Sequence, residues 1–101
     1  MFSKNIRVIA HFKAKPEKID ALRSFLLKFI APTLLEKGCI EYELHQNTDE
    51  PRDFTFIEAW QSHESLDQHL KSPHIQSALP LIGDLVSESP DIRRYVKCEE
   101  V

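Results

Sequence analysis

Hydrophobic and polar residues alternate in four short segments of this chain, which is the pattern of β-strands with one buried face. The first segment, Ile6 to Ala14, sets a uniformly apolar face against a mixed face. The others are Ile40 to His45, Phe54 to Gln61, and Ile92 to Cys98. We therefore predict four strands, and the polar turn from Asn47 to Asp53 makes the second and third a hairpin.

Apolar residues recur every three or four positions between the first two strands, from Ile19 to Leu34. This spacing predicts an amphipathic helix packed on a sheet. Pro16 suits its first turn, Pro32 predicts a bend near its end, and Gly38 is the residue type that ends a helix most readily.

A second helical region follows the third strand. Ser62 is a suitable N-cap for a short helix, and Ser72 with Pro73 has the form of a second helix start. An apolar stripe from Ile75 to Val86 then continues the helical spacing. We predict that this region is kinked or broken at Pro73.

The resulting order is strand, helix, strand, strand, helix pair, strand. It predicts an α+β fold of the ferredoxin-like β-α-β-β-α-β kind with a four-stranded antiparallel sheet, formed by residues 1–101 as a single domain. The helices can cover only one face of such a sheet. Because strand residues on both faces are apolar, we expect a second copy of the chain to cover the other face in a homodimer.

The composition excludes several classes of protein. The chain is 42% hydrophobic and 29% charged, with a formal net charge of −3 and scattered basic residues, so a nucleic-acid partner is not expected. No apolar run has the length of a signal peptide or a spanning helix, which favours a cytoplasmic protein without a membrane partner. Cys39 and Cys98 are too few for a disulfide framework, and we expect two free thiols.

Several short motifs occur in an order that resembles the antibiotic biosynthesis monooxygenase family. They are Val8-Ile9-Ala10, Lys15-Pro16, Gly38-Cys39-Ile40-Glu41-Tyr42-Glu43-Leu44, Glu58-Ala59-Trp60 and His69-Leu70-Lys71-Ser72-Pro73-His74. The resemblance covers nearly the whole chain, and Glu17 departs from it by standing where the family commonly has Gly. The resemblance implies a homodimer whose sheets form a dimeric α+β barrel, with a pocket in each subunit between sheet and helices.

The activities implied by this resemblance are diverse. Some members oxidise quinols or anthrone-like aromatics with O2 and without metal or flavin, and others isomerise a phosphorylated sugar or degrade haem. The Asn, Trp and His of the haem-degrading branch correspond here to Ile9, His69 and Leu79 by ungapped alignment. Because all three are replaced, we do not expect haem.

Two histidines are candidate catalytic residues. His69 shares the sheet-facing side of its helix with Leu66, so it is either a general base or a core histidine bonded to the backbone. His11 lies on the mixed face of the first strand, where it either converges on the same pocket or is an ordinary polar strand residue.

Aromatic residues are the candidate substrate-binding groups. Tyr42 and Trp60 offer flat walls with one polar atom each, although core packing is favoured for Trp60. Glu58 shares a strand face with Phe54, Phe56 and Trp60. It is either a buried acid with a raised pKa or, as we favour, the partner of Arg7, Arg93 or Arg94 in an ion pair.

Metal and nucleotide cofactors are not expected. The five histidines form no closely spaced ligand pair, His74 is explained by helix capping, and the chain has only two glycines for a phosphate-binding loop. We therefore predict cofactor-independent oxygenation of a small quinol or polyphenolic aromatic by O2. The alternatives are an isomerase of a small carbonyl or phosphorylated compound and a dimeric module that only binds a small molecule.

Overall fold

The computed structural model describes residues 5–98 of the chain. Its four strands are β1 (Ile6–Lys13), β2 (Cys39–Gln46), β3 (Asp53–Trp60) and β4 (Asp91–Tyr95). They form one antiparallel sheet in the order β2-β3-β1-β4. The predicted ferredoxin-like fold is therefore confirmed.

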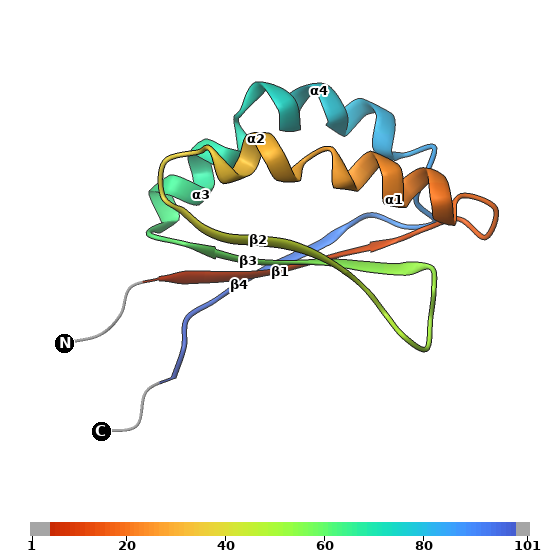
Figure 1. Ribbon diagram of the computed structural model, residues 1–101, viewed down its shortest axis with the longest axis horizontal. Coiled ribbons are helices and arrows are strands. Elements are labelled where there is room, and N and C mark those ends of the chain that lie inside the picture. The colour runs from red at the N-terminus through yellow and green to blue at the C-terminus, as the bar shows by residue number, and fades with distance from the viewer. Residues whose placement is uncertain (1–4, 99–101) are drawn as a thin grey trace.

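Four helices pack on one face of this sheet: α1 (Ile19–Leu27), α2 (Ile30–Leu34), α3 (His63–Leu70) and α4 (Pro73–Ile82). Figure 1 shows all of them above the strands, with the other face of the sheet uncovered by any described helix. Within residues 5–98, no helix is long and apolar enough to cross a membrane.

The first predicted helix is divided into α1 and α2, with the break at residues 28–29. The cause lies in Pro32, which has no N–H to donate to the carbonyl four residues earlier and whose ring crowds that carbonyl. That earlier residue is Lys28, where α1 ends. The backbone closes the gap with a tighter bond, since the Phe29 N–H donates to the Leu26 carbonyl at 3.0 Å.

The predicted break in the second helical region is confirmed at residues 71–72, between α3 and α4. Ser62 caps α3 as expected, because its Oγ accepts a hydrogen bond from the Ser65 N–H at 3.1 Å. Ser72 precedes Pro73 at the start of α4, but its hydroxyl donates back to the His69 carbonyl at 2.6 Å. This bond ties the end of α3 to the start of α4.

The last strand is shorter than predicted and ends at Tyr95. Its ladder with β1 runs to the pair formed by Tyr95 and Arg7, close to the first residue of β1. The ladder ends at this pair, and residues 96–98 continue beyond the strand. Cys98 lies in this extension, while Cys39 starts β2 at the opposite edge of the sheet, and both thiols are free as predicted.

Alternation along β1 separates two environments. Ile6, Val8, Ala10 and Phe12 are buried under the helices, and the residues between them point to the uncovered face. In β3 even the outward positions are at most half-exposed. The apolar core thus lies between the sheet and the helices. Any cavity there is lined on its β1 side by the buried residues of that strand.

Gly38 makes the turn from α2 into β2. Its φ of 87° lies in the left-handed region, and its carbonyl accepts a hydrogen bond from the Gln61 N–H at 2.8 Å. An added Cβ would also collide with the Ser65 hydroxyl. This turn sets the start of β2 against the N-terminal end of α3, and it directly follows the loop that carries Glu36.

Candidate functional site

A cavity of about 360 Å³ lies between the sheet and the helices. Its apolar lining comes from β1, β3, β4, α3 and α4, together with Phe29 of the short α1–α2 connection and Pro90 just before β4. The apolar side chains are Val8, Ala10, Phe12, Phe29, Phe56, Leu66, Leu70, Ile75, Ala78, Leu79, Ile82, Pro90 and Ile92. A cavity of this size and character suits a small, flat, apolar ligand.

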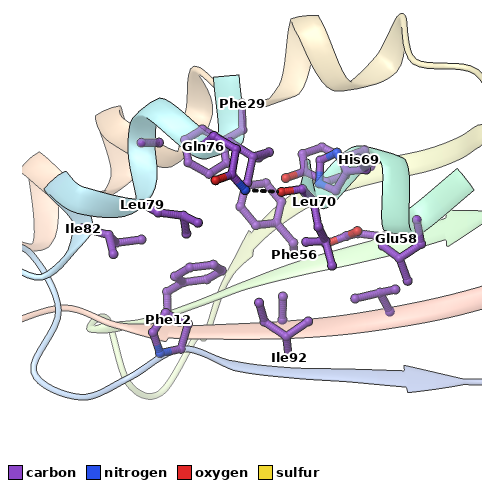
Figure 2. Close-up of a pocket in the computed structure, with 17 residues that line it drawn as sticks. Phe12, Phe29, Phe56, Glu58, His69, Leu70, Gln76, Leu79, Ile82 and Ile92 are labelled. Atoms are coloured by element: carbon purple, nitrogen blue, oxygen red, sulfur yellow. Dashed lines mark hydrogen bonds between the residues drawn. The ribbon is translucent and has the colours of Figure 1, made fainter. Parts of the chain in front are cut away.

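Four side chains with polar atoms interrupt the apolar wall: Tyr42, Glu58, His69 and Gln76. Figure 2 shows Glu58 and His69 at one end of the cavity, while Phe12, Leu79 and Ile82 lie toward the other. The Gln76 amide is already engaged, since its Nε2 donates to the Leu70 carbonyl at 2.6 Å. The titratable side chains Glu58 and His69 therefore lie together at one end of the cavity.

His69 is held in the last turn of α3 and is 3% exposed. Its ring centroid lies 4.7 Å from that of Trp60 and 5.5 Å from that of Tyr42. Burial lowers the pKa of His69, and the nearby Glu36 carboxylate opposes that shift. The neutral imidazole, which can accept a proton, is thus favoured near neutral pH.

Glu36 fixes the orientation of this imidazole. His69 Nδ1 lies 2.7 Å from Glu36 Oε2, and because a carboxylate can only accept, Nδ1 carries the proton and donates it. Nε2 then holds a lone pair. Among the described residues no bond to Nε2 is present and no buried side-chain nitrogen or oxygen lacks a partner, so Nε2 reaches open space. Because His69 lines the apolar cavity, we infer that this space is the cavity.

Glu58 is a buried acid, and the ion pair that we favoured is wrong. Its Oε1 accepts a hydrogen bond from Trp60 Nε1 at 2.8 Å. The three arginines pair with other acids: Arg7 with Glu41, Arg93 with Asp91 and Arg94 with Asp67. For Arg7 the physical reason is alternation, because Glu58 points to the helix side of the sheet while Arg7 points to the open side. Arg94 lies opposite Val8 and is held instead by Asp67 of α3.

Burial raises the pKa of Glu58 to about 7, against the opposing effect of the Trp60 hydrogen bond. A carboxyl group with this pKa exchanges protons near neutral pH, which is the property required of a general acid or base. Glu58 and His69 are therefore two side chains on one cavity wall that have the properties needed to transfer protons.

Tyr42 and Phe56 form an aromatic wall beside these groups. Their ring centroids are 4.6 Å apart in a stacked arrangement, and Phe56 also stacks with Phe29 at 6.1 Å. Burial, followed by the Glu58 charge, raises the pKa of the Tyr42 phenol against the opposing effect of a hydrogen bond with Thr33, so this hydroxyl stays protonated. Such a wall can stack against a planar ring.

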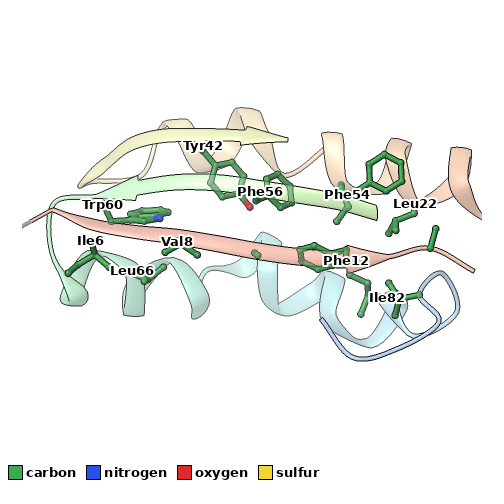
Figure 3. Close-up of a cluster of buried hydrophobic side chains, with 14 residues drawn as sticks. Ile6, Val8, Phe12, Leu22, Tyr42, Phe54, Phe56, Trp60, Leu66 and Ile82 are labelled. Carbon is green, nitrogen blue, oxygen red and sulfur yellow. The ribbon is translucent and has the colours of Figure 1, made fainter. Parts of the chain in front are cut away.

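Three of the predicted site residues do not line this cavity. His11 points to the open face of the sheet, where its Nδ1 lies 2.8 Å from the Thr55 hydroxyl, so it does not converge with His69. Trp60 and Phe54 belong to the buried core, as Figure 3 shows. Trp60 still acts on the site indirectly, through its bond to Glu58 and its contact with His69.

Sequence reasoning missed Glu36, Thr33 and His74. His74 does not cap its helix: its Nε2 lies 2.9 Å from Thr33 Oγ1 in α2 and 3.6 Å from Glu36 Oε2. One signal was present, because an acid just after a helix C-terminus is electrostatically unfavourable and invites a search for a basic partner. The ligand atoms of Glu36, His69 and His74 lie within 4.8 Å of one another, a cluster that spacing along the chain does not predict.

Leu79 lies on the cavity wall, where the resemblance to haem-degrading proteins placed an iron-ligating histidine. Its apolar side chain offers no ligand there. Ile9 points to the open face, so a molecule in the cavity would not contact it. Position 79 therefore contributes an apolar surface to the cavity that Glu58 and His69 line, and no metal-binding group.

Comparison with known proteins places the chain in a family. The sequence profile of the antibiotic biosynthesis monooxygenase family matches residues 5–80. A Mycobacterium tuberculosis protein described as a candidate monooxygenase is 34% identical over 82 residues, which is 81% of this chain and 80% of that protein. Its solved structure superposes with a TM-score of 0.88, covering 95% of this chain and 97% of that one.

Two further relatives extend this picture. An uncharacterised Synechocystis protein is 30% identical over 89% of this chain, which spans only 61% of the length of that relative. The solved structure of a conserved Methanosarcina mazei protein is 34% identical, has a TM-score of 0.89 and is covered to 95%, as is this chain. The chain belongs to the antibiotic biosynthesis monooxygenase family.

Proposed function

We propose that this protein is a cofactor-independent monooxygenase that oxidises a small quinol or polyphenolic aromatic with O2. The observation that carries the proposal is an apolar cavity whose one polar end holds an oriented, neutral histidine, His69, with its acceptor nitrogen facing the ligand space. A base in a dry site suits a phenolic substrate, because an ionised quinol supplies its own electrons to O2.

The overall reaction is quinol plus O2 giving hydroxyquinone plus water, in which the quinol loses four electrons and O2 gains them. His69 Nε2 takes a phenolic proton, and the electron-rich anion forms a C–O bond with O2 to give a ring peroxide. Loss of the hydrogen on that carbon as a proton forms the new carbonyl and breaks the O–O bond. The departing hydroxide takes up a proton and leaves as water.

Glu58 is the second proton-transfer group in this scheme. Its pKa of about 7 lets it protonate the departing oxygen and then recover a proton from solvent or from His69. Tyr42 and Phe56 hold the substrate ring by stacking. His11 has no part in this scheme, since it lies on the other face.

The test is oxygen uptake with a panel of small quinols, measured aerobically and anaerobically. We expect oxygen-dependent hydroxyquinone formation by the wild-type protein and a loss of at least about tenfold in Glu36→Gln, where the wrong nitrogen of His69 becomes protonated. His45→Gln is the matched control, because His45 is exposed and pairs only with Glu43 among the described residues. Equal rates in all three proteins would overturn the proposal.

An isomerase of a small carbonyl compound is the second candidate. Two proton-transfer groups on one wall, Glu58 and His69, are the equipment for moving a proton between carbon atoms. No Lys or Arg lines the cavity in the described chain, which makes a phosphorylated substrate the less suitable choice. Turnover that persists without O2 would select the isomerase, and binding without turnover of any panel member would select a binding module.

We also propose that the chain works as a homodimer in the cytoplasm. The open face of the sheet pairs Ile9 with Ile57 at its centre, and Tyr95 and Val96 are exposed near its edge. A second sheet packed there would bury these apolar groups, and the free Cys39 and Cys98 suit a reducing compartment. Sedimentation at micromolar concentration should give a dimer, whereas Ile57→Glu should give a monomer. A folded wild-type monomer would contradict this.

A further inference from the structure

We propose that Glu36, His69 and His74 form a binding site for a divalent transition metal ion such as Zn²⁺ or Co²⁺, and that a bound ion prevents His69 from acting as a base. The three residues come from three places in the fold: the turn before β2, the last turn of α3 and the first turn of α4. The metal-binding half of this inference stands on the cluster alone. The inhibitory half rests on the proposed function.

The distances already approach those of a coordination shell. Zinc bonds to nitrogen and oxygen of about 2.0 to 2.1 Å place tetrahedral ligands about 3.3 Å apart. Glu36 Oε2 lies 2.7 Å from His69 Nδ1 and 3.6 Å from His74 Nε2. All three ligand atoms lie within 4.8 Å of one another, so side-chain rotations that move them by about an ångström would bring them to tetrahedral spacing.

The donor set has the chemistry that these metals select. Two imidazole nitrogens and one carboxylate are a three-ligand set that leaves a fourth position for water. The side chains are also well packed, with exposures of 4% for His69, 19% for Glu36 and 24% for His74. Ligands held this firmly lose little freedom when an ion binds, which favours affinity.

An entry route from solvent lies on the side away from the apolar cavity. Glu36 also lines a polar hollow of about 390 Å³ together with Glu64, Gln68 and Lys37. A hydrated cation can therefore approach the Glu36 carboxylate without crossing the substrate cavity. Thr33, which now lies 2.9 Å from His74 Nε2, would release that nitrogen to the ion.

Metal binding and base catalysis need opposite states of His69. Now the imidazole keeps its proton on Nδ1, facing Glu36, and its lone pair on Nε2, facing the cavity. An ion bound at Nδ1 displaces that proton, so the neutral ring carries its hydrogen on Nε2 instead. Nε2 is then a hydrogen-bond donor toward the cavity and no longer an acceptor, so His69 cannot remove a phenolic proton.

The binding test uses Co²⁺ as the probe and needs no substrate. Chelator-treated protein is titrated with Co²⁺ and followed by visible absorption, where histidine and carboxylate ligation gives bands in the visible range. We expect one ion per chain for the wild type, and Kd values raised at least about tenfold in His74→Gln and Glu36→Gln. His45→Gln, which removes an exposed His45–Glu43 pair, should bind as the wild type does. Absence of the bands, or equal binding by all four proteins, overturns the proposal.

The inhibition test adds Zn²⁺ to the quinol assay. We expect wild-type turnover to fall at least about tenfold at saturating Zn²⁺. The rate of each variant with Zn²⁺ is compared with the rate of the same variant without metal. His74→Gln should need a much higher Zn²⁺ concentration for the same fractional loss. Co²⁺ binding without inhibition overturns the inhibitory half. Co²⁺ binding by a protein that turns over no quinol contradicts the proposed function and leaves the metal site supported.

Discussion

A histidine lies beside a carboxylate on each side of the sheet, and the two pairs differ in distance and in exposure to solvent. On the helix-covered face, His69 Nδ1 lies 2.7 Å from Glu36 and the imidazole side chain is 4% exposed. On the open face, His11 Nδ1 lies 3.4 Å from Asp53 and the side chain is 48% exposed. Both are pairs of an imidazole with a carboxylate, so the difference comes mainly from their surroundings.

Burial restricts His69 to one tautomer and one partner, whereas the exposed His11 can change partners. In a low-dielectric setting the Glu36 bond fixes one tautomer of His69, and leaving either group unpaired would be costly. His11 shares its Nδ1 between Asp53 and the Thr55 hydroxyl and is open to water, which supports little stabilisation. Pairing of a histidine with an acid therefore indicates a site only where the fold excludes water.

The largest expected effect separates the two histidines by turnover. His69→Ala should lower oxygen-dependent quinol consumption about 10²- to 10⁴-fold, the range for losing one acid-base group, with little change in ligand binding. His11→Ala should change it less than about threefold. Both variants are assayed in the same quinol panel, with melting temperatures recorded to confirm folding. Unchanged turnover in His69→Ala would remove His69 from the mechanism.

Next in size is the stability of the two faces. Phe56 is 1% exposed under the helices, and Phe56→Ala should lower the free energy of unfolding by about 3 to 5 kcal/mol through lost burial and a cavity. Thr55, its neighbour, points to the open face, and Thr55→Ala should cost less than about 1 kcal/mol. Urea unfolding measures both. Equal losses would mean that the open face is as well packed as the helix-covered one.

The smallest effect concerns pH. Burial raises the Glu58 pKa to about 7 in the folded protein from 4.5, so the fold favours the protonated acid. Its contribution to stability is full below about pH 4.5 and falls as pH rises to about 7, by about 3 kcal/mol in all. Glu58→Gln cannot ionise and still offers an oxygen to Trp60, so it should remove this loss.

The measurement compares urea unfolding of Glu58→Gln and wild type at pH 4 and pH 8. The stability difference between the two proteins should shift in favour of Glu58→Gln by about 3 kcal/mol at the higher pH. Glu43→Gln provides a surface control, because Glu43 is exposed and such changes stay within about 0.5 kcal/mol. Parallel curves for Glu58→Gln and wild type would show that Glu58 is not held protonated.

Local patterns were sufficient for most of the fold. The alternation in β1, the Ser62 cap and the Pro73 helix start all act through neighbours a few residues away, so the sequence displays them directly. The break after Lys28 could also be predicted from the local sequence, since Pro32 acts on the carbonyl four residues before it. The prediction placed the bend near the proline and missed its true position.

The candidate site was only partly accessible in this way. His69 could be singled out because it shares a helix face with Leu66, and Tyr42 and Phe56 because strand alternation points them inward. Glu58 was assigned the wrong partner, since its bond to Trp60 depends on which side of β3 faces the helices. Glu36 had no distinguishing spacing at all.

The sequence by itself determined the order of strands and helices, their apolar faces and the family to which the chain belongs, because these depend on periodicity and on short motifs. Tertiary structure alone decided that Glu36, His69 and His74 meet, that His11 is turned away from them, and that Glu58 is buried without a cation. The physical reason is that pKa values, tautomers and ligand clusters depend on distance and dielectric between groups far apart in the chain. Those quantities exist only once the helices close over the sheet.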